Sequence, residues 1–162
     1  MRGRERLEAY LREHGVRYEI RPHVEAYTAQ EVAAAEHVSG RQFAKVVIAE
    51  VDGATVMLVL PAALRVDLLR LRAALGATSA RLAREEEFAP RFPDCEPGAM
   101  PPFGHLYGLP VYMDRSLVGQ ERLVFNACSH RETIAMAGGD YERLARPTIA
   151  DFAAQPAPAA RG

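Results

Sequence analysis

The chain of 162 residues contains no tryptophan, only two cysteines, and a single lysine, Lys45, among its 20 basic residues. It also lacks an excess of charge of either sign, since its formal net charge at pH 7 is −1. This balance excludes a histone-like polycation and limits nucleic-acid binding to a local basic patch. No apolar run approaches the roughly 18 residues of a membrane-spanning helix. The start, MRGRERLEAY, has no apolar segment typical of a secretory signal. We therefore expect a cytoplasmic protein in which Cys95 and Cys128 are reduced thiols.

Length and composition predict a single globular domain. Hydrophobic residues make up 49% of the chain and charged residues 25%, which is ordinary for a folded protein. The sequence has no internal repeat and no composition shift that would mark a second domain. We expect one domain over residues 1–152 and a disordered tail over residues 153–162, which read AAQPAPAARG.

Hydrophobic periodicity predicts a mixed α/β fold of six or seven strands with surrounding helices. Its centre is a hairpin of residues 44–51 and 54–60 joined by Asp52-Gly53, a typical two-residue turn. Because both strands are apolar at nearly every position, we expect both of their faces to be covered. The other expected strands are residues 16–20, 80–83, 111–113, 123–126 and 133–137. The expected helices are residues 4–14, 28–37, 62–75, 85–92 and 141–145, the last with Asp140 as its N-cap. The phosphate-binding glycine motifs GxGxxG and GxxxxGK are absent.

Three separate features are candidates for carrying chemistry. Lys45 is the second residue of a buried strand, where an ammonium needs an anionic partner or a route to water. Gly98 and the Pro101-Pro102 pair would form a rigid loop that presents backbone N–H groups. His130 has a pKa range suited to orienting water or sharing a proton. Each feature also has a purely structural interpretation. Lys45 could be a strand-end lysine paired with a surface glutamate, the loop could be a crossover, and His130 could be a structural histidine.

Cysteines and histidines form no recognisable metal motif. Cys95, His105, Cys128 and His130 lack the spacing of known metal sites, so we expect no metal and no cofactor. Cys128 and His130 could act as nucleophile and base. A small cysteine-dependent hydrolase therefore stays as one hypothesis.

The order and spacing of these features resemble the YbaK/EbsC family. The resemblance rests on Phe-Ala-Lys45-Val-Val, a hairpin ending in Leu-Pro61, the Gly98-x-x-x-Pro102 loop followed by Phe-Gly, and Asn126-Ala-x-x-His130. The family includes free-standing ProX-type proteins and the editing domain of bacterial prolyl-tRNA synthetase. The resemblance extends from about residue 5 to residue 152.

This resemblance implies a barrel-like mixed α/β domain and an enzyme. Family members hydrolyse the ester bond of a mischarged tRNA that carries a small amino acid such as alanine or cysteine. They act in trans, without a metal or a covalent nucleophile. The resemblance places the essential lysine at Lys45, the GxxxP loop at Gly98 and Pro102, and the late histidine at His130. At Cys128 the sequence departs from the small residue that many relatives carry.

Physical roles follow from the resemblance. Lys45, Gly98 and His130 would be the catalytic residues. Backbone N–H groups of residues 98–100 would stabilise the developing oxyanion, each donor being worth about 3 kcal/mol in comparable hydrolases. Lys45 would hold the terminal phosphate or the carbonyl, and His130 would fix the loop or the water. The expected substrate contacts are Ala99, Met100, Pro101, Pro102, Phe103 and Ser129. Pocket volume would select the amino acid.

The implied partner is the acceptor end of a mischarged tRNA, and an aminoacyl-tRNA synthetase is a further candidate. Two arginine groups are candidates for the tRNA contact: Arg2, Arg4, Arg6 and Arg12, and Arg65, Arg70 and Arg72. We expect weak, salt-sensitive binding. The alternative function is a non-catalytic module that binds aminoacyl-tRNA or another RNA as a sensor. Deacylation of mischarged tRNA separates the two.

Overall fold

The computed structural model describes residues 3–22 and 40–156. The helix expected at residues 28–37 and the end of the expected tail lie outside the described residues. The helices are α1 (Gly3–Glu13), α3 (Leu68–Leu75), α4 (Glu85–Phe88) and α5 (Gly138–Ala145), with 3-10 turns η1 (Ala89–Arg91), η2 (Gly104–Tyr107) and η3 (Arg115–Leu117). The strands are β1 (Tyr18–Pro22), β2 (Ala44–Val51), β3 (Ala54–Pro61), β4 (Arg65–Val66), β5 (Ala80–Leu82), β6 (Val111–Asp114), β7 (Arg122–Ser129), β8 (Glu132–Ala137), β9 (Thr148–Ala150) and β10 (Ala153–Ala154).

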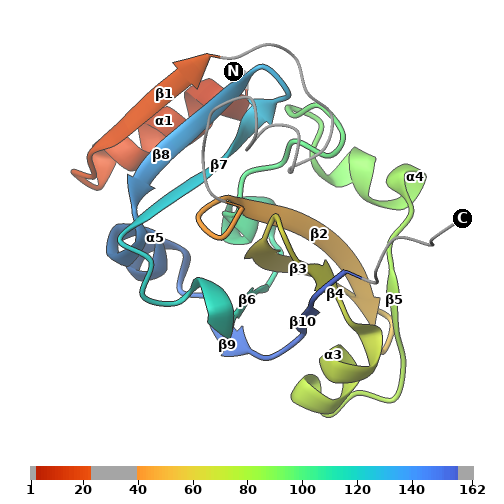
Figure 1. The fold of residues 1–162 in the computed structure, drawn as a ribbon. Helices are drawn as coiled ribbons and strands as arrows, with labels where there is room; N and C mark the ends of the chain where they lie inside the picture. Colours follow the sequence, from red (N-terminus) through yellow and green to blue (C-terminus); the bar gives the residue numbers. More distant parts are fainter. Residues whose placement is uncertain (1–2, 23–39, 157–162) are drawn as a thin grey trace, which may run out of the picture.

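In the described part of the chain the strands form three sheets (Figure 1). The largest has the order β5-β2-β3-β6-β9, and its β3–β6 and β6–β9 pairs are parallel while its other pairs are antiparallel. The second sheet is β1-β8-β7 and the third is β10-β4. A parallel bridge between Phe43 and Val124 joins the start of β2 to β7. The mixed α/β fold is confirmed, with the β2–β3 hairpin at its centre.

The hairpin turn has the geometry that its sequence predicts. Asp52 and Gly53 have φ angles of 49° and 81°, the left-handed pair that an Asp-Gly turn supplies. The Asp52 carboxylate also accepts hydrogen bonds from the backbone N–H groups of Thr78 and Ser79, at 3.0 and 2.9 Å. These bonds tie the tip of the hairpin to the segment between α3 and β5.

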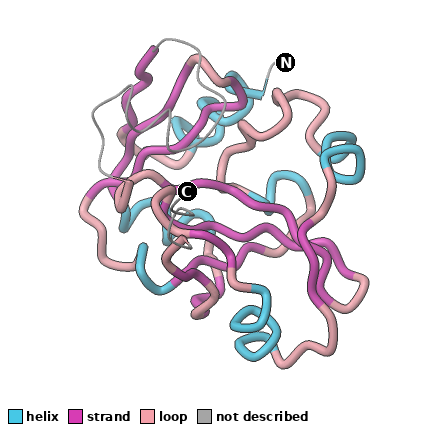
Figure 2. Tube along the Cα trace, turned by 45° about the vertical axis from the view of Figure 1, so that its right-hand side comes forward, coloured by secondary structure: helices cyan, strands magenta, loops and turns pink. Residues whose placement is uncertain are grey.

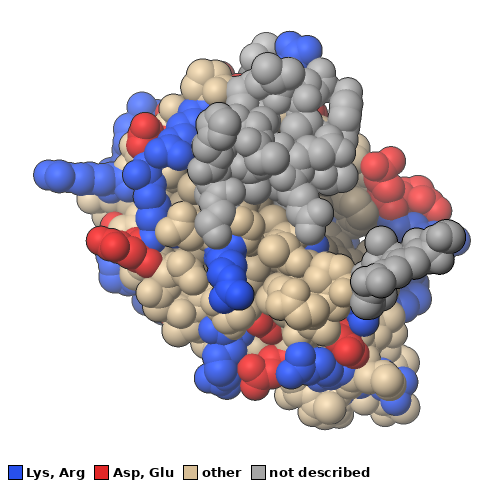
Figure 3. Space-filling model, in the orientation of Figure 1, with Lys and Arg blue, Asp and Glu red and all other residues tan. Residues whose placement is uncertain are grey.

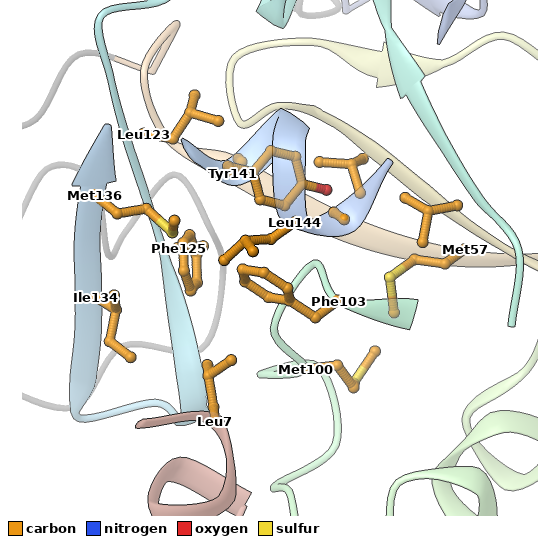
Figure 4. Close-up of a cluster of buried hydrophobic side chains, with 14 of the residues drawn as sticks. Leu7, Met57, Met100, Phe103, Leu123, Phe125, Ile134, Met136, Tyr141 and Leu144 are labelled. Atoms are coloured by element: carbon orange, nitrogen blue, oxygen red, sulfur yellow. The ribbon is translucent and has the colours of Figure 1, made fainter. Parts of the chain in front are cut away.

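Strand β2 separates two hydrophobic clusters. Ala44 and Ile48 face the first cluster, which contains Phe103, Phe125 and Tyr141 and is closed by Leu7 and Leu11 of α1 (Figure 4). Ala49 and Val51 face the second cluster, which contains Leu71 of α3 and Phe152. Both faces of the hairpin are therefore covered, as predicted. Figure 2 shows the helices on the outside of the strands. None of the helices in the described ranges is long and apolar enough to cross a membrane.

Two helices begin at positions other than those predicted. The helix expected directly after Pro61 starts at Leu68, because the Asp67 carboxylate caps it by accepting from the N–H groups of Leu69 and Arg70. The turn expected at residues 138–140 is instead the first turn of α5. Its N-cap is Ala137 rather than Asp140.

Candidate functional site

The loop that contains Gly98, Pro101 and Pro102 is hydrogen-bonded to the end of β7. The N–H of Glu96 donates to the carbonyl of Cys128, and the N–H of Cys128 donates to the carbonyl of Ala99, both at 3.0 Å. Gly98 lies between these two anchors. Two segments about 30 residues apart in the chain are thus fixed side by side.

Gly98 and His130, two of the predicted catalytic residues, lie next to each other where the loop is hydrogen-bonded to Cys128. Gly98 has a φ of +85°, which a residue with a side chain rarely adopts. A Cβ built on Gly98 would lie 3.5 Å from Cε1 of His130. His130 is buried and its Nε2 lies 2.8 Å from the carbonyl of Pro97, so Nε2 carries the proton and donates. The backbone N–H of His130 donates to the Glu96 carboxylate at 3.1 Å. His130 therefore holds the loop through both its ring and its backbone.

The loop offers fewer backbone N–H donors for an oxyanion than the three predicted from the sequence at residues 98–100. The N–H of Ala99 donates to the carbonyl of Glu96 at 3.0 Å and is committed to a turn. Within the described residues, the N–H groups of Gly98 and Met100 donate to no protein acceptor. The N–H groups of Gly98 and Met100 are therefore the candidates left in residues 98–100 for donating to an oxyanion.

The second half of the loop is anchored in the first cluster. The buried hydroxyl of Tyr141 donates to the carbonyl of Pro102 at 2.8 Å, and burial raises the pKa of this phenol, which keeps it protonated. The ring of Phe103 is fully buried and packs edge-on against Tyr141 and Phe125 (Figure 4). Within residues 98–103 only Gly98 is exposed. The side chains of the expected substrate contacts Ala99, Met100, Pro101, Pro102 and Phe103 thus lie beneath the surface and shape the loop from its core side.

Ser129, the remaining expected contact, is half-buried at the end of β7. Its Oγ accepts a hydrogen bond from the N–H of Arg131 at 3.0 Å. This bond holds the tight connection from β7 to β8, one residue before His130.

Lys45 lies on β2, where it shares a strand face with Val47, Ala49 and Val51 as predicted. It is half-buried, and burial lowers the pKa of its ammonium group. Its Nζ lies 3.4 Å from the carbonyl of Ala62, to which it donates. In residues 3–22 and 40–156 no carboxylate forms an ion pair with it, and no hydrogen bond joins it to Gly98 or His130.

Strand β7 connects the surroundings of Lys45 with the loop. Lys45 lies two residues beyond Phe43, and Asn126 lies two residues beyond Val124, the partner of Phe43 in the parallel bridge. Side chains two residues apart on a strand share a face, so Lys45 and Asn126 lie on the same side where β2 and β7 diverge. Asn126 is only 7% exposed, and its Oδ1 has no hydrogen-bond partner among the described residues. In the sequence, Asn126 stood out only as part of the Asn126-Ala-x-x-His130 motif. Its burial, which marks it as a candidate binding residue, was not visible there.

Cys95 and Cys128 are joined by a disulfide, with their Cα atoms 4.3 Å apart. The expectation of two reduced thiols is therefore wrong for this structure. The reason is the docking of the loop on β7, which brings together residues 33 positions apart. While this disulfide is formed, neither sulfur can act as the thiolate nucleophile that the cysteine-dependent hydrolase requires. In the described residues no group of three or more His, Cys, Asp or Glu side chains is arranged to hold a metal.

In the described part of the chain, the arginines of the two candidate groups do not form one free basic surface. Arg4 pairs with Glu8 and Glu132, and Arg6 pairs with Asp94 and lies over the ring of Tyr107. Arg65 and Arg70 donate to backbone carbonyls near the end of the described chain, while Arg12 and Arg72 are exposed. Arg2 lies outside the described residues. Figure 3 shows basic and acidic side chains interspersed over the visible part of one face.

Residues 23–144 of the chain match the family model of the aminoacyl-tRNA editing domain, a stretch that includes Lys45, the Gly98 loop and His130. The chain belongs to the aminoacyl-tRNA editing domain family. The resemblance inferred from the sequence is thereby confirmed, and with it a role of this editing domain in aminoacyl-tRNA editing. No curated protein matches the chain.

Solved structures share the fold of this editing domain. One is described as hypothetical protein APE2540, with a TM-score of 0.81 at 19% identity, over 91% of this chain and 99% of that one. Another is described as a candidate trans-editing enzyme for prolyl-tRNA synthetase, with a TM-score of 0.76 at 22% identity, over 96% of this chain and 98% of that one. Identities this low establish the common fold alone.

Proposed function

We propose that this editing domain is a trans-editing hydrolase that deacylates tRNA mischarged with a small amino acid. The main support is the exposed Gly98, held at positive φ against His130 with its N–H uncommitted among the described residues. A rigid backbone donor at the surface, next to a histidine that fixes it, is suited to binding the carbonyl oxygen of an ester. The family membership and the description of one structural neighbour as a candidate trans-editing enzyme agree with this proposal.

The reaction we propose needs neither a metal nor a covalent nucleophile. A water oxygen attacks the ester carbonyl carbon, and the N–H groups of Gly98 and Met100 stabilise the negative charge that develops on the carbonyl oxygen. The bond between that carbon and the ribose oxygen then breaks. The ribose oxygen takes up the proton that the attacking water gives up, and the products are the amino acid and tRNA with its terminal hydroxyl restored. Because an aminoacyl ester is already reactive, positioning the water supplies much of the acceleration.

Lys45 is the positive group of the proposed site. Its charge is neutralised by no carboxylate in the described ranges, so it can bind a phosphate of the terminal nucleotide or the reacting carbonyl. The Oδ1 of Asn126, which has no hydrogen-bond partner within residues 3–22 and 40–156, is an acceptor on the same face. We assign it to the O–H of the attacking water or of the terminal ribose, which it can orient but not deprotonate.

Selectivity for a small amino acid follows from pocket size in this proposal. One methylene contributes only about 1–3 kcal/mol of discrimination, so exclusion of larger side chains is the efficient device. We assign the protein to the cytoplasm, where tRNA is charged. We also propose the tRNA acceptor end as its partner, presented alone or on a synthetase.

A deacylation screen tests the proposed function. Purified protein is incubated with tRNAs charged with labelled alanine, cysteine, serine or proline, and release of the amino acid is compared with release in buffer. We expect accelerated release from at least one of them. Binding of charged tRNA without release from any of them would instead support the sensor module.

A further inference from the structure

The conformation of Cys128 is unusual for a residue with a side chain. Its φ is 66°, in the left-handed region where glycine is unstrained and other residues are strained. It lies in the irregular step of β7 between Asn126 and Ser129, where the register with β8 shifts. A side chain kept at such a position calls for a compensating interaction. The disulfide with Cys95 supplies one.

The disulfide spans the joint that positions Gly98. Cys128 exchanges backbone hydrogen bonds with Glu96 and Ala99, the residues on either side of the Gly98 turn. Cys95 directly precedes Glu96. The sulfur–sulfur bond therefore adds a covalent link to the hydrogen bonds that hold the loop on β7.

Small molecules have access to this pair. Cys95 is half-buried, and both cysteines line a pocket of about 750 Å³ together with Gly3, Arg4, Asp94 and Glu96. The hydroxyl of Tyr107 lies 3.4 Å from Sγ of Cys95 and donates to the Asp94 carboxylate. Cys128 is only 6% exposed, so a small thiol or a peroxide would reach the pair through this pocket at the half-buried Cys95.

We propose that Cys95 and Cys128 form a reversible thiol–disulfide pair whose oxidised state fixes the Gly98 loop and whose reduced state loosens it. With hydrogen peroxide, one thiolate attacks an oxygen and becomes a sulfenic acid while hydroxide leaves and takes a proton. The second thiol displaces water from that sulfur and forms the disulfide. Two thiols are oxidised and one peroxide is reduced to two waters. Glutathione reverses the step by thiol–disulfide exchange and is itself oxidised to glutathione disulfide.

The effect on catalysis rests on the proposed function. Displacement of a positioning group by about 1 Å can lower a rate by up to about 100-fold. A loosened loop keeps its hydrogen bonds for only part of the time, so we expect kcat of the reduced enzyme to be about tenfold lower. The affinity for tRNA should change little, because the exposed Arg12 and Arg72 do not line the pocket that contains the pair.

Thiol counting tests the pair itself. The chain has two cysteines, so wild-type protein equilibrated with glutathione disulfide and then unfolded should show no titratable thiol, and protein equilibrated with excess reduced glutathione should show two. Amide hydrogen exchange of Glu96, Ala99 and Cys128, whose N–H groups donate to the backbone carbonyls that hold the loop on β7, should be slower in the oxidised protein. Two titratable thiols after treatment with both glutathione disulfide and hydrogen peroxide would overturn the proposal, and so would equal exchange in the two states.

Two variants make the activity test specific. Cys128→Gly removes the thiol and relieves the strained φ, and Cys95→Ser removes the partner sulfur with little change in volume. Both should have the kcat of the reduced wild type and no response to redox treatment. Equal kcat of oxidised and reduced wild type would overturn the proposal, as would a redox response that persists in both variants. If no form of the protein deacylates tRNA, the proposed function fails, while thiol counting and hydrogen exchange still decide whether the pair controls the loop.

Discussion

Substitution of Gly98 by alanine tests whether the backbone at this position acts in the reaction. A Cβ on Gly98 would meet His130 at 3.5 Å, an ordinary van der Waals distance, so the new methyl group fits. The penalty comes from the φ of +85°, which costs a residue with a side chain about 1–2 kcal/mol. For a domain of this size we expect the Tm to fall by about 2–8 °C. The same strain would rotate the peptide that carries the Gly98 N–H.

The effect of Gly98→Ala on activity should greatly exceed its effect on stability. Loss of one oxyanion donor lowers kcat by about 100- to 1000-fold in comparable hydrolases. Steady-state deacylation of a mischarged tRNA should therefore show a large decrease in kcat with a smaller change in KM. The protein would remain folded at the assay temperature, which circular dichroism can confirm.

Gly119 provides the matched control for Gly98. It has a φ of +84° and is exposed, and a methyl group added there would have no neighbour within 4 Å. It precedes β7, whereas His130 follows β7, and eight strand residues separate the two by roughly 26 Å. Gly119→Ala should show a similar fall in Tm and the activity of the wild type. Wild-type kcat in folded Gly98→Ala, or an equal loss of activity in both variants, would refute the assignment of a backbone donor to Gly98.

Three further predictions concern the anchor of the loop, the lysine and the tRNA contact. Tyr141→Phe leaves the buried carbonyl of Pro102 without its donor and should lower the free energy of unfolding by about 1–3 kcal/mol in urea titrations. Tyr112→Phe is the control, because the Tyr112 hydroxyl bonds to no described residue, and it should change the free energy of unfolding by less than about 0.5 kcal/mol. Equal effects of the two substitutions would contradict the assignment of the Tyr141 hydroxyl as the donor to Pro102. Burial lowers the pKa of Lys45, so the folded protein binds this proton less tightly than the unfolded chain, and stability should rise as pH increases towards the ordinary value of 10.5. Lys45→Met should therefore be more stable than the wild type at about pH 7, with a difference that shrinks as pH approaches 10.5; a difference independent of pH would exclude a charged, desolvated Lys45. Because most described arginines of the two candidate groups bond to carboxylates or backbone carbonyls, binding of tRNA should weaken with salt at a logarithmic slope of only about −2 to −3, and a flat affinity between about 50 and 300 mM salt would exclude the phosphate contacts.

The sequence predicted the parts of the fold that depend on local chemistry. The Asp52-Gly53 turn fixes its hairpin because both residues tolerate positive φ, and the apolar character of β2 and β3 correctly indicated two covered faces. The starts of α3 and α5 were less predictable. The leucine pattern that ends at Leu75 continues upstream of the Asp67 cap, and the two glycines at residues 138–139 are typical of a turn. In α5 tertiary packing decides where the helix begins, because Gly138 packs so closely against the backbone of Gln120 that a Cβ there would overlap its carbonyl oxygen.

In the candidate site, too, residue types and spacing could be predicted, whereas features that depend on tertiary packing could not. Gly98 and His130 were identified by residue type and spacing, and the structure brings them together. Burial of Phe103 and commitment of the Ala99 N–H depend on how the loop docks on β7 and the first cluster, which no local pattern encodes. The disulfide was missed for the same reason, since Cys95 and Cys128 belong to no motif and meet only through the fold.

The proposed function requires that the chain hydrolyse an aminoacyl ester at a site that contains Lys45. Its most direct test is multiple-turnover release of alanine from a proline-specific tRNA mischarged with alanine, measured for the wild type and for Lys45→Ala at matched concentrations of folded protein. We predict many turnovers per molecule of wild-type protein and a decrease of at least about 100-fold in the variant. Release at the same rate by both proteins would contradict the account.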